Sequence, residues 1–185
     1  MMAKLAFSDP TPSVYLARPC QFVSSQACTP LMWTDRRFSP EVLASLDHAL
    51  DQIKARLGNQ DFELVGYSGG AALALLLASR RDDIAHVHTL AGNFSPRQWV
   101  ALHDLRPLTG SLEPLDERQR LAHVKQRHFV GSEDRVVPPP LLDRYRRALG
   151  EARCVQSIVV PGARHGEGLE QAWRTWRNQP LVCQP

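Results

Sequence analysis

The chain has 185 residues, of which 43% are hydrophobic and 22% are charged, and its formal net charge is +3. This length suffices for a buried core, so we expect a single domain over residues 1–185. The basic residues are scattered without an aromatic-basic strip, which argues against nucleic-acid binding, and no stretch is long or apolar enough to span a bilayer.

The N-terminal segment MMAKLAFSDP makes a poor signal peptide, because its apolar core is short and no small-residue cleavage site follows. The chain as given is therefore expected to be cytoplasmic. Its four cysteines form no C-x-x-C or Cys/His cluster, so no metal site is predicted. We expect free thiols. The alternative is a disulfide between Cys20 and Cys28, which would imply export to an oxidising compartment.

Short β-rich runs alternate with helical stretches along the chain, a pattern typical of a mostly parallel sheet flanked by helices. The fold class is therefore predicted to be α/β. Five strands are expected, at residues 13–17, 62–67, 86–91, 127–131 and 155–160.

The predicted helix over residues 39–58 has clear start and stop signals. Ser39 can cap it, Pro40 suits its first position, and Gly58 can end it. Its apolar residues recur at helical spacing and form one stripe. Further helices are expected over residues 70–82, 139–150 and 168–178.

The segment over residues 93–124 is irregular and long for a connection. It contains Pro96, Pro107 and Pro114, and its helical pieces are short. Two interpretations stay open for this segment. It is either a lid or pocket wall above a site, or a plain helical crossover between two strands.

The sequence GYSGG places Ser68 between a β-rich run and a strongly apolar helix. In this context the pattern G-x-S-x-G predicts a nucleophile elbow, a tight strand-to-helix turn that exposes the serine hydroxyl. Gly66 and Gly70 would relieve the steric clashes of that turn. The backbone N–H of Gly69, at the helix N-terminus, is then a candidate oxyanion donor. The alternative is a glycine-rich turn with an incidental serine.

Two further loops, each after a predicted strand, offer the partners that a nucleophilic serine needs. GSEDRVVPP places Asp134 after one strand, with Glu133 as its competitor, and GARHG places His165 after the last strand. A histidine there can act as the base, and a carboxylate can orient it. The other histidines have no comparable loop setting, and the order Ser, Asp, His argues against coincidence.

With GYSGG, GSEDRVVP and GARHG at these places, the chain resembles the α/β-hydrolases, which include serine esterases and lipases. The resemblance extends over nearly all of the chain from Ser13 onward. It implies a doubly wound sheet with the site at the carboxyl ends of the strands. It also implies acyl transfer with Ser68 as nucleophile, His165 as base and Asp134 as the orienting acid, without a metal or cofactor.

The chain departs from this family at its start. The family fold has eight strands, whereas five are predicted here, so we expect a truncated α/β-hydrolase fold in which residues 13–17 match the fourth family strand. The second oxyanion donor of the family comes from a loop, often rich in glycine, before the nucleophile, and no such sequence is found here. Backbone N–H groups of Cys20 or Gln21 are the candidates to replace it.

Two functions are compatible with these features. The first is a serine hydrolase acting on a small-molecule ester or other acyl substrate through an acyl-serine. The second is a non-catalytic or truncated α/β-hydrolase-like protein that serves as a binding module. The complete set of Ser, Asp and His favours the first, and the short N-terminal part favours the second. A sheet edge left open by missing strands would also allow a homodimer.

Overall fold

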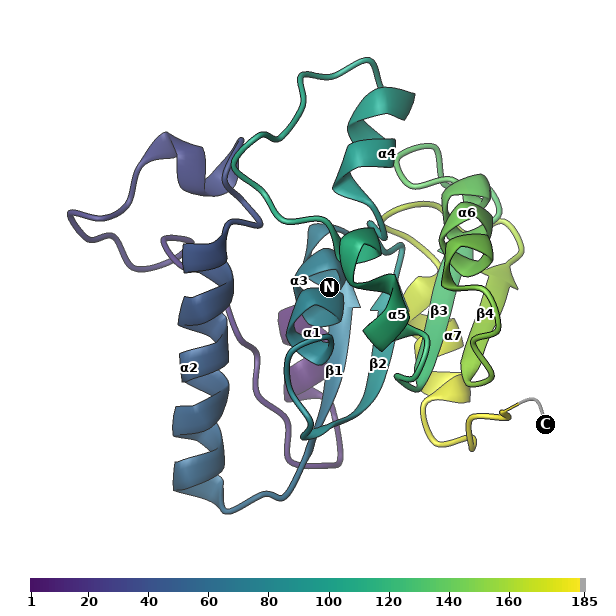
Figure 1. Cartoon of the computed structure of the whole chain (residues 1–185). Helices are drawn as coiled ribbons and strands as arrows, with labels where there is room; N and C mark the ends of the chain where they lie inside the picture. Colours follow the sequence, from purple (N-terminus) through teal and green to yellow (C-terminus); the bar gives the residue numbers. More distant parts are fainter. Residues whose placement is uncertain (184–185) are drawn as a thin grey trace. The chain divides into compact units, whose positions relative to one another are not determined.

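The described part of the chain divides into two compact units. Figure 1 draws the helices and strands of both, coloured along the sequence. The computed structural model describes residues 1–183. The first unit comprises Met1–Gly58 and Leu108–Leu112, and the second comprises Asn59–Pro107 and the described residues from Glu113 onward. The expected single domain over residues 1–185 stays a prediction.

The first unit contains the helices α1 (Met2–Phe7) and α2 (Pro40–Leu57) and the short 3-10 helix η1 (Pro30–Trp33). Helix α2 begins and ends as the sequence predicts. The hydroxyl of Ser39 accepts a hydrogen bond from the backbone N–H of Val42 at 3.4 Å, and Gly58 has the left-handed conformation with φ of 71°. Glycine adopts this conformation without the steric cost of a Cβ atom.

Asp35 joins the two segments of the first unit. Its carboxylate accepts hydrogen bonds from the backbone N–H groups of Thr109 and Gly110 at 2.8 and 3.1 Å. The hydroxyl of Ser111 donates to the carbonyl of Asp35 at 2.6 Å. These hydrogen bonds attach residues 108–112 to the N-terminal segment.

Two expectations for the first unit are wrong. Residues 13–17 form neither a helix nor a strand. A β-prone run needs the ladder hydrogen bonds of a neighbouring strand, and its composition alone does not make it a strand. Cys20 and Cys28 are joined in a disulfide, so they are not free thiols.

The second unit is built on a sheet of four parallel strands, β1 (Phe62–Tyr67), β2 (Ile84–Leu90), β3 (Gln126–Gly131) and β4 (Val155–Val160). Their spatial order is the chain order, so β1 and β4 are the edge strands. The pairs Tyr67–Leu90 and Gly131–Val160 show that the strands end together at the carboxyl edge. Four of the five predicted strands and the α/β class are confirmed.

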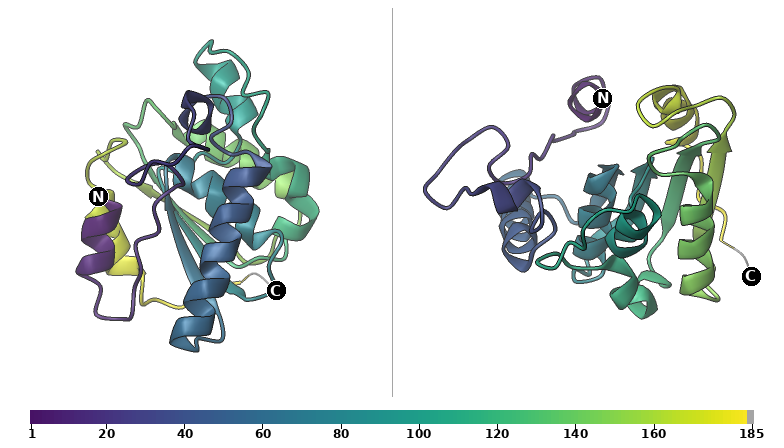
Figure 2. Two further views of the ribbon diagram at one scale, coloured as in Figure 1. Left: turned by 90° about the vertical axis from the view of Figure 1, so that its left-hand side faces the viewer. Right: turned by 90° about the horizontal axis from the view of Figure 1, so that it is seen from above.

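Helices cover both faces of this sheet (Figure 2). The helical elements of this unit are α3 (Gly69–Ala78), α4 (Pro96–Leu102), η2 (Pro114–Glu117), α5 (Arg118–Leu121), α6 (Pro139–Leu149) and α7 (Leu169–Trp176). On one face, α3, α5 and α6 enclose the main apolar core. On the other face, Trp173 of α7 packs edge-on against the rings of His88 and Phe129. Trp173 therefore covers this face of the sheet.

The segment over residues 93–124 connects the parallel neighbours β2 and β3. Its two ends are anchored in the second unit, because Phe94 and Leu121 are both buried in the apolar core. Residues 108–112 belong to the first unit. The segment is thus a crossover connection, and its role as a lid stays a prediction.

A row of hydrogen-bonded polar side chains lies inside the second unit. Thr89, Gln126, His128 and Tyr145 are all 0% exposed. Tyr145 Oη donates to Gln126 Oε1 at 2.7 Å, and this oxygen also accepts a hydrogen bond from His128 Nε2 at 3.0 Å. His128 Nδ1 then accepts from the hydroxyl of Thr89 at 2.8 Å. Burial lowers the pKa of His128 to about 3, so its ring is neutral.

The chain after α7 is fixed to the sheet by a second disulfide, Cys154–Cys183, so these cysteines are not free thiols either. The guanidinium of Arg127 on β3 donates to the carbonyls of Trp176 and Gln179 at 2.6 and 2.9 Å. No sequence motif predicts the Cys154–Cys183 disulfide, because the two cysteines are far apart in the sequence and lie in unrelated contexts.

Candidate active site

Ser68 lies at the turn between β1 and α3 in a strained backbone conformation, with φ of 51° and ψ of −121°. A residue other than glycine holds such a conformation when surrounding contacts impose it. The N–H of Ser68 donates to the carbonyl of Leu90 at 3.1 Å. The carbonyl of Ser68 accepts from the N–H groups of Ala71 and Asn93, both at 3.0 Å. These three hydrogen bonds fix the backbone that carries the hydroxyl.

Gly66 is required for this turn, whereas Gly70 is not. A Cβ atom at Gly66 would lie 2.6 Å from the Cα atom of Ala71, which is backbone and cannot move aside. A Cβ atom at Gly70 would meet nothing within 4 Å, so the expectation that Gly70 relieves a clash is wrong. The second close approach comes from Gly92 after β2, where a Cβ atom would lie 2.9 Å from the Cβ atom of Ala71.

Asp134 follows β3 in a tight loop and is 2% exposed. Its Oδ1 accepts hydrogen bonds from the backbone N–H groups of Val136 and Val137 at 2.8 and 2.9 Å. Aspartate favours local turns of this kind, and the turn leaves Oδ2 available for another donor. The competitor Glu133 instead forms a surface ion pair, with its Oε2 3.3 Å from Nε of Arg164.

His165 lies in a two-residue turn after β4. Arg164 and Glu167 exchange backbone hydrogen bonds at 3.0 and 3.3 Å, and His165 and Gly166 form the tip between them. This turn holds the imidazole close to the carboxyl edge of the sheet.

The loop of Asp134 and the loop of His165 approach each other closely. The N–H of Glu133 donates to the carbonyl of Ala163 at 3.0 Å, and the N–H of Gly162 donates to the hydroxyl of Ser132 at 2.8 Å. A Cβ atom at Gly131 would lie 2.2 Å from the carbonyl oxygen of Ala163, so the approach requires glycine there.

The structure brings Ser68, His165 and Asp134 together in one hydrogen-bonded chain. Nδ1 of His165 lies 2.9 Å from Oδ2 of Asp134, and Nε2 lies 3.0 Å from Oγ of Ser68. Because a carboxylate accepts hydrogen bonds, Nδ1 carries the proton and Nε2 accepts from the serine hydroxyl. The side chain of Asp134 is 0% exposed and that of His165 is 19% exposed. The imidazole can therefore take the serine proton and still be reached by a small molecule.

Tyr67, the residue before Ser68, packs against His165 with ring centroids 5.2 Å apart. Burial raises the pKa of the Tyr67 hydroxyl, and the negative charge of Asp134 raises it further. Tyr67 therefore stays neutral, and it forms one wall of the imidazole site.

The predicted oxyanion donors lie in different units. The N–H of Gly69 is the first of helix α3 and has no acceptor within the helix, at the positive end of the helix dipole. Cys20 and Gln21 belong to the first unit, so their position relative to Ser68 stays a prediction. The N–H of Gln21 already donates to the carbonyl of Arg18 at 3.2 Å within its own loop.

Two residues that no motif predicts also contact this arrangement. Asn93, 5% exposed, donates its N–H to the carbonyl of Ser68, and its buried Oδ1 has no hydrogen-bond partner among the described residues. Trp99 donates its Nε1–H to the carbonyl of Val136 at 2.8 Å. The position of Asn93 just after a predicted strand is the sequence signal that points to it. Trp99 has no such signal.

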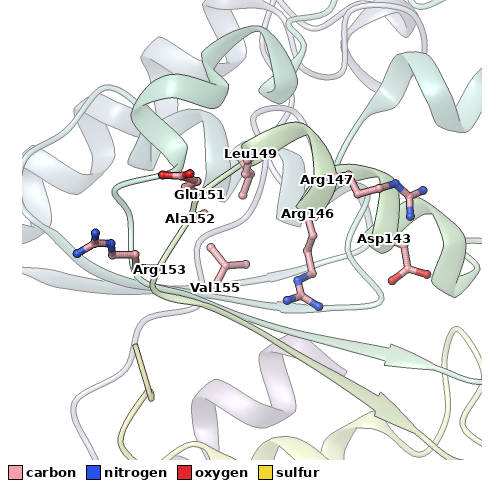
Figure 3. A pocket seen from close by; sticks show the side chains of 9 residues that line it. Asp143, Arg146, Arg147, Leu149, Glu151, Ala152, Arg153 and Val155 are labelled. Carbon is pink, nitrogen blue, oxygen red and sulfur yellow. The ribbon is translucent and has the colours of Figure 1, made fainter. Parts of the chain in front are cut away.

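A separate pocket of about 600 Å³ lies where α6 ends and β4 begins (Figure 3). Arg146, Arg147 and Arg153 are among the residues that line it. Arg146 and Arg147 occupy the last turn of α6, where positive charge stabilises the helix C-terminus. None of the residues around Ser68 lines this pocket. The presence of Arg146 and Arg147 is explained by their favourable position at the C-terminus of α6.

Residues 1–183 hold neither a metal-binding cluster nor a membrane-spanning helix. No group of three or more His, Cys, Asp or Glu side chains in this range is arranged to hold a metal ion. None of the helices in this range has the length and apolar character needed to cross a membrane.

No protein-family model and no curated protein sequence matches the chain. Solved structures do match it. An esterase from Pyrococcus furiosus aligns with a TM-score of 0.59 at 13% identity, over 76% of this chain and 59% of the esterase. The acylaminoacyl peptidase of Pyrococcus horikoshii aligns with a TM-score of 0.61 at 11% identity, over 73% of this chain and 25% of the peptidase. A puromycin-hydrolyzing peptidase of Mycobacterium tuberculosis aligns with a TM-score of 0.54 at 19% identity, over 68% of this chain and 22% of the peptidase.

These matches show the fold. The chain has the α/β-hydrolase fold, as the resemblance of its motifs predicts. It spans 59% of the length of the esterase and 25% of the length of the acylaminoacyl peptidase.

Proposed function

We propose that this chain, with its α/β-hydrolase fold, is a serine hydrolase that acts on carboxylic esters. The observation that carries the proposal is the chain of two hydrogen bonds from Ser68 Oγ through His165 to Asp134, at 3.0 and 2.9 Å. A serine hydroxyl is a weak nucleophile until an adjacent base removes its proton. The esterase and peptidases of similar fold support the same general reaction class.

The proposed reaction passes through an acyl-serine. Oγ of Ser68 attacks the ester carbonyl while Nε2 of His165 takes the hydroxyl proton. The bond from the carbonyl carbon to the leaving oxygen then breaks, and His165 gives its proton to the leaving alcohol. Water attacks the acyl-serine with His165 again as the base, which releases the carboxylic acid and restores Ser68. The steps need no metal or organic cofactor.

Asp134 and Gly69 have supporting roles in this proposal. The buried carboxylate of Asp134 keeps the imidazole in the tautomer with the proton on Nδ1 and stabilises the imidazolium that forms. The N–H of Gly69 stabilises the oxyanion of the tetrahedral intermediate. Losing one such oxyanion donor typically costs about 100- to 1,000-fold in rate.

Trapping the acyl-serine tests the proposal. The chain is mixed with p-nitrophenyl acetate, quenched in acid, digested and analysed by mass spectrometry. We expect a burst of p-nitrophenol and an acetyl group on the peptide that contains Ser68. Ser157→Ala is the matched control, because Ser157 Oγ on β4 is buried without a hydrogen-bond partner among the described residues. Hydrolysis that continues in Ser68→Ala, with acetyl groups elsewhere, would contradict the proposal.

A second candidate function is a non-catalytic binding module. The position of β1 favours it, because the strand that leads into Ser68 is an edge strand and pairs with β2 alone among the described strands. In this candidate the three residues keep their hydrogen bonds while the oxyanion site stays incomplete. Folded protein that binds p-nitrophenyl acetate without releasing p-nitrophenol would favour it over the hydrolase.

The two disulfides support an oxidising compartment, which we propose as the working location. Cys20–Cys28 closes a loop of the first unit, and Cys154–Cys183 fixes the end of the second. Reducing compartments keep such cysteines as thiols. Thiol labelling of the protein from its native host, before and after reduction, checks this. Labelling before reduction would contradict it.

A further inference from the structure

We propose that Trp99 and His103 act together as positioning residues that hold the loop of Asp134 in place, an inference that rests on the proposed hydrolase. Nε1 of Trp99 lies 2.8 Å from the carbonyl oxygen of Val136, and Nε2 of His103 lies 2.7 Å from the same oxygen. Both rings therefore donate to one acceptor, which has two lone pairs to receive them.

Val136 connects this acceptor directly to Asp134. Its N–H donates to Oδ1 of Asp134 at 2.8 Å, while its carbonyl oxygen receives the two ring donors. Oδ2 of Asp134 in turn accepts from Nδ1 of His165 at 2.9 Å. A continuous path of hydrogen bonds thus runs from α4 through the Asp134 loop to the imidazole and to Ser68.

Helix α4, which carries Trp99 and ends directly before His103, is itself well fixed. Ser95 caps α4 by accepting from the N–H of Gln98 at 3.1 Å, and the N–H of Arg97 donates to Oε2 of Glu113 at 2.9 Å. Trp99 and His103 are four residues apart, so they lie on the same side of the helical turn, with ring centroids 5.2 Å apart. The Asp134 loop, by contrast, is exposed at Val136, which is 41% exposed.

The shared acceptor predicts how the two residues combine. Removing one donor leaves the Val136 carbonyl bonded to the other, so the loop stays in place. Removing both leaves the exposed loop held by its own turn, and Asp134 then shifts relative to His165. Small misplacements of catalytic groups cost about 100-fold in rate. The two substitutions are therefore expected to be strongly non-additive.

The test compares the wild type with five variants of the full chain. Trp99→Phe and His103→Ala are each expected to lower kcat for p-nitrophenyl acetate by about 3-fold. The double variant is expected to lose about 30- to 100-fold, with KM little changed. His103→Gln keeps a side-chain N–H donor and should restore activity when combined with Trp99→Phe. Leu102→Ala is the control on α4, because Leu102 is 46% exposed and has no part in the path.

A proton NMR signal separates this inference from the proposed function. The Nδ1–H of His165, bonded to the Asp134 carboxylate, should give a far-downfield resonance that needs no turnover. We expect this resonance in the wild type and both single variants, and its loss in the folded double variant, even if no variant hydrolyses esters. A folded double variant that keeps the resonance and the wild-type kcat would overturn the inference, and so would two single effects that multiply to the double effect. Absence of hydrolysis in the wild type, with the resonance lost in the double variant alone, would contradict the hydrolase and keep the inference.

Discussion

His165 and His128 have similar hydrogen bonds and opposite chemistry. Each imidazole accepts from one hydroxyl, Ser68 or Thr89, and each donates to one side-chain oxygen. His165 donates from Nδ1 to a carboxylate and is 19% exposed. His128 donates from Nε2 to the amide oxygen of Gln126 and is 0% exposed.

The difference lies in the acceptor and in access. A carboxylate stabilises an imidazolium, so His165 can take a proton during a reaction. A neutral amide offers no such charge, and complete burial lowers the pKa of His128 to about 3. A hydroxyl next to an imidazole is therefore not a sign of catalysis by itself. The third group and the exposure of the ring decide its role.

The largest effect on the rate of ester hydrolysis should come from removing the side chain of Ser68 or that of His165. Ser68→Ala and His165→Ala are expected to lower the rate of ester hydrolysis by on the order of 10⁴- to 10⁶-fold. Thr89→Val, which removes the hydroxyl beside His128, should leave the rate of the folded protein within about 3-fold. Steady-state hydrolysis of p-nitrophenyl acetate measures both. A comparable loss in Thr89→Val would remove the contrast between the two histidines.

Asp134→Asn changes the acceptor of His165 into an amide like that of His128. An amide in this place can hold the ring in the wrong tautomer and does not stabilise the imidazolium, so we expect a loss of kcat on the order of 10⁴-fold. Glu133→Gln is the control, because Glu133 makes a surface ion pair and should change kcat less than about 2-fold. Equal losses in the two variants would mean that the buried carboxylate has no special role.

Gly131→Ala should separate the two loops that bring Asp134 to His165. The new Cβ atom would lie 2.2 Å from the carbonyl oxygen of Ala163, so one loop must move. We expect kcat to fall about 100-fold, together with a lower Tm. Gly166→Ala is the matched control, because a Cβ atom there meets nothing within 4 Å. Wild-type kcat in Gly131→Ala would show that the loops tolerate the displacement.

The buried His128 should make stability depend on pH. Its pKa is about 3 in the folded chain against an ordinary 6.5, so between these values the unfolded chain binds a proton that the folded chain does not. Unfolding free energy therefore falls as the pH is lowered from 6.5 toward 3, by up to about 1.4 kcal/mol per pH unit from this group. Urea unfolding at pH 7 and pH 5 measures the slope. His128→Asn should be less stable at pH 7, and its unfolding free energy should depend less steeply on pH. An unchanged pH dependence would mean that other groups cause it.

The sequence predicted the parts of the fold and site that depend on local pattern. The helix α2, with Ser39 and Gly58 at its ends, and the four strands of the sheet follow from capping and periodicity. Ser68, Asp134 and His165 were proposed together because each follows a strand and parallel strands end at one edge. The structure joins them by hydrogen bonds, and their catalytic roles stay a prediction. Glu133 could not be excluded from sequence, because its exposure depends on how the loop turns.

The remaining features depend on contacts between distant segments. The prediction of a strand at residues 13–17 was wrong, because a strand needs a neighbouring strand to hydrogen-bond with, and amino-acid composition does not show whether one is present. The Cys154–Cys183 disulfide and the need for glycine at Gly131 arise where separate loops meet. The two ring donors to Val136 come from α4 and the residue that follows it, more than 30 residues earlier in the chain. Such pairings have no signature in either segment alone.

Labelling with a fluorophosphonate probe measures whether Ser68 is an activated nucleophile. We expect a covalent adduct on Ser68 in the wild type and in folded His128→Asn, and no adduct in Ser68→Ala or His165→Ala. A folded wild-type chain that takes up no probe, or an adduct that persists in Ser68→Ala, would contradict the proposed role of Ser68.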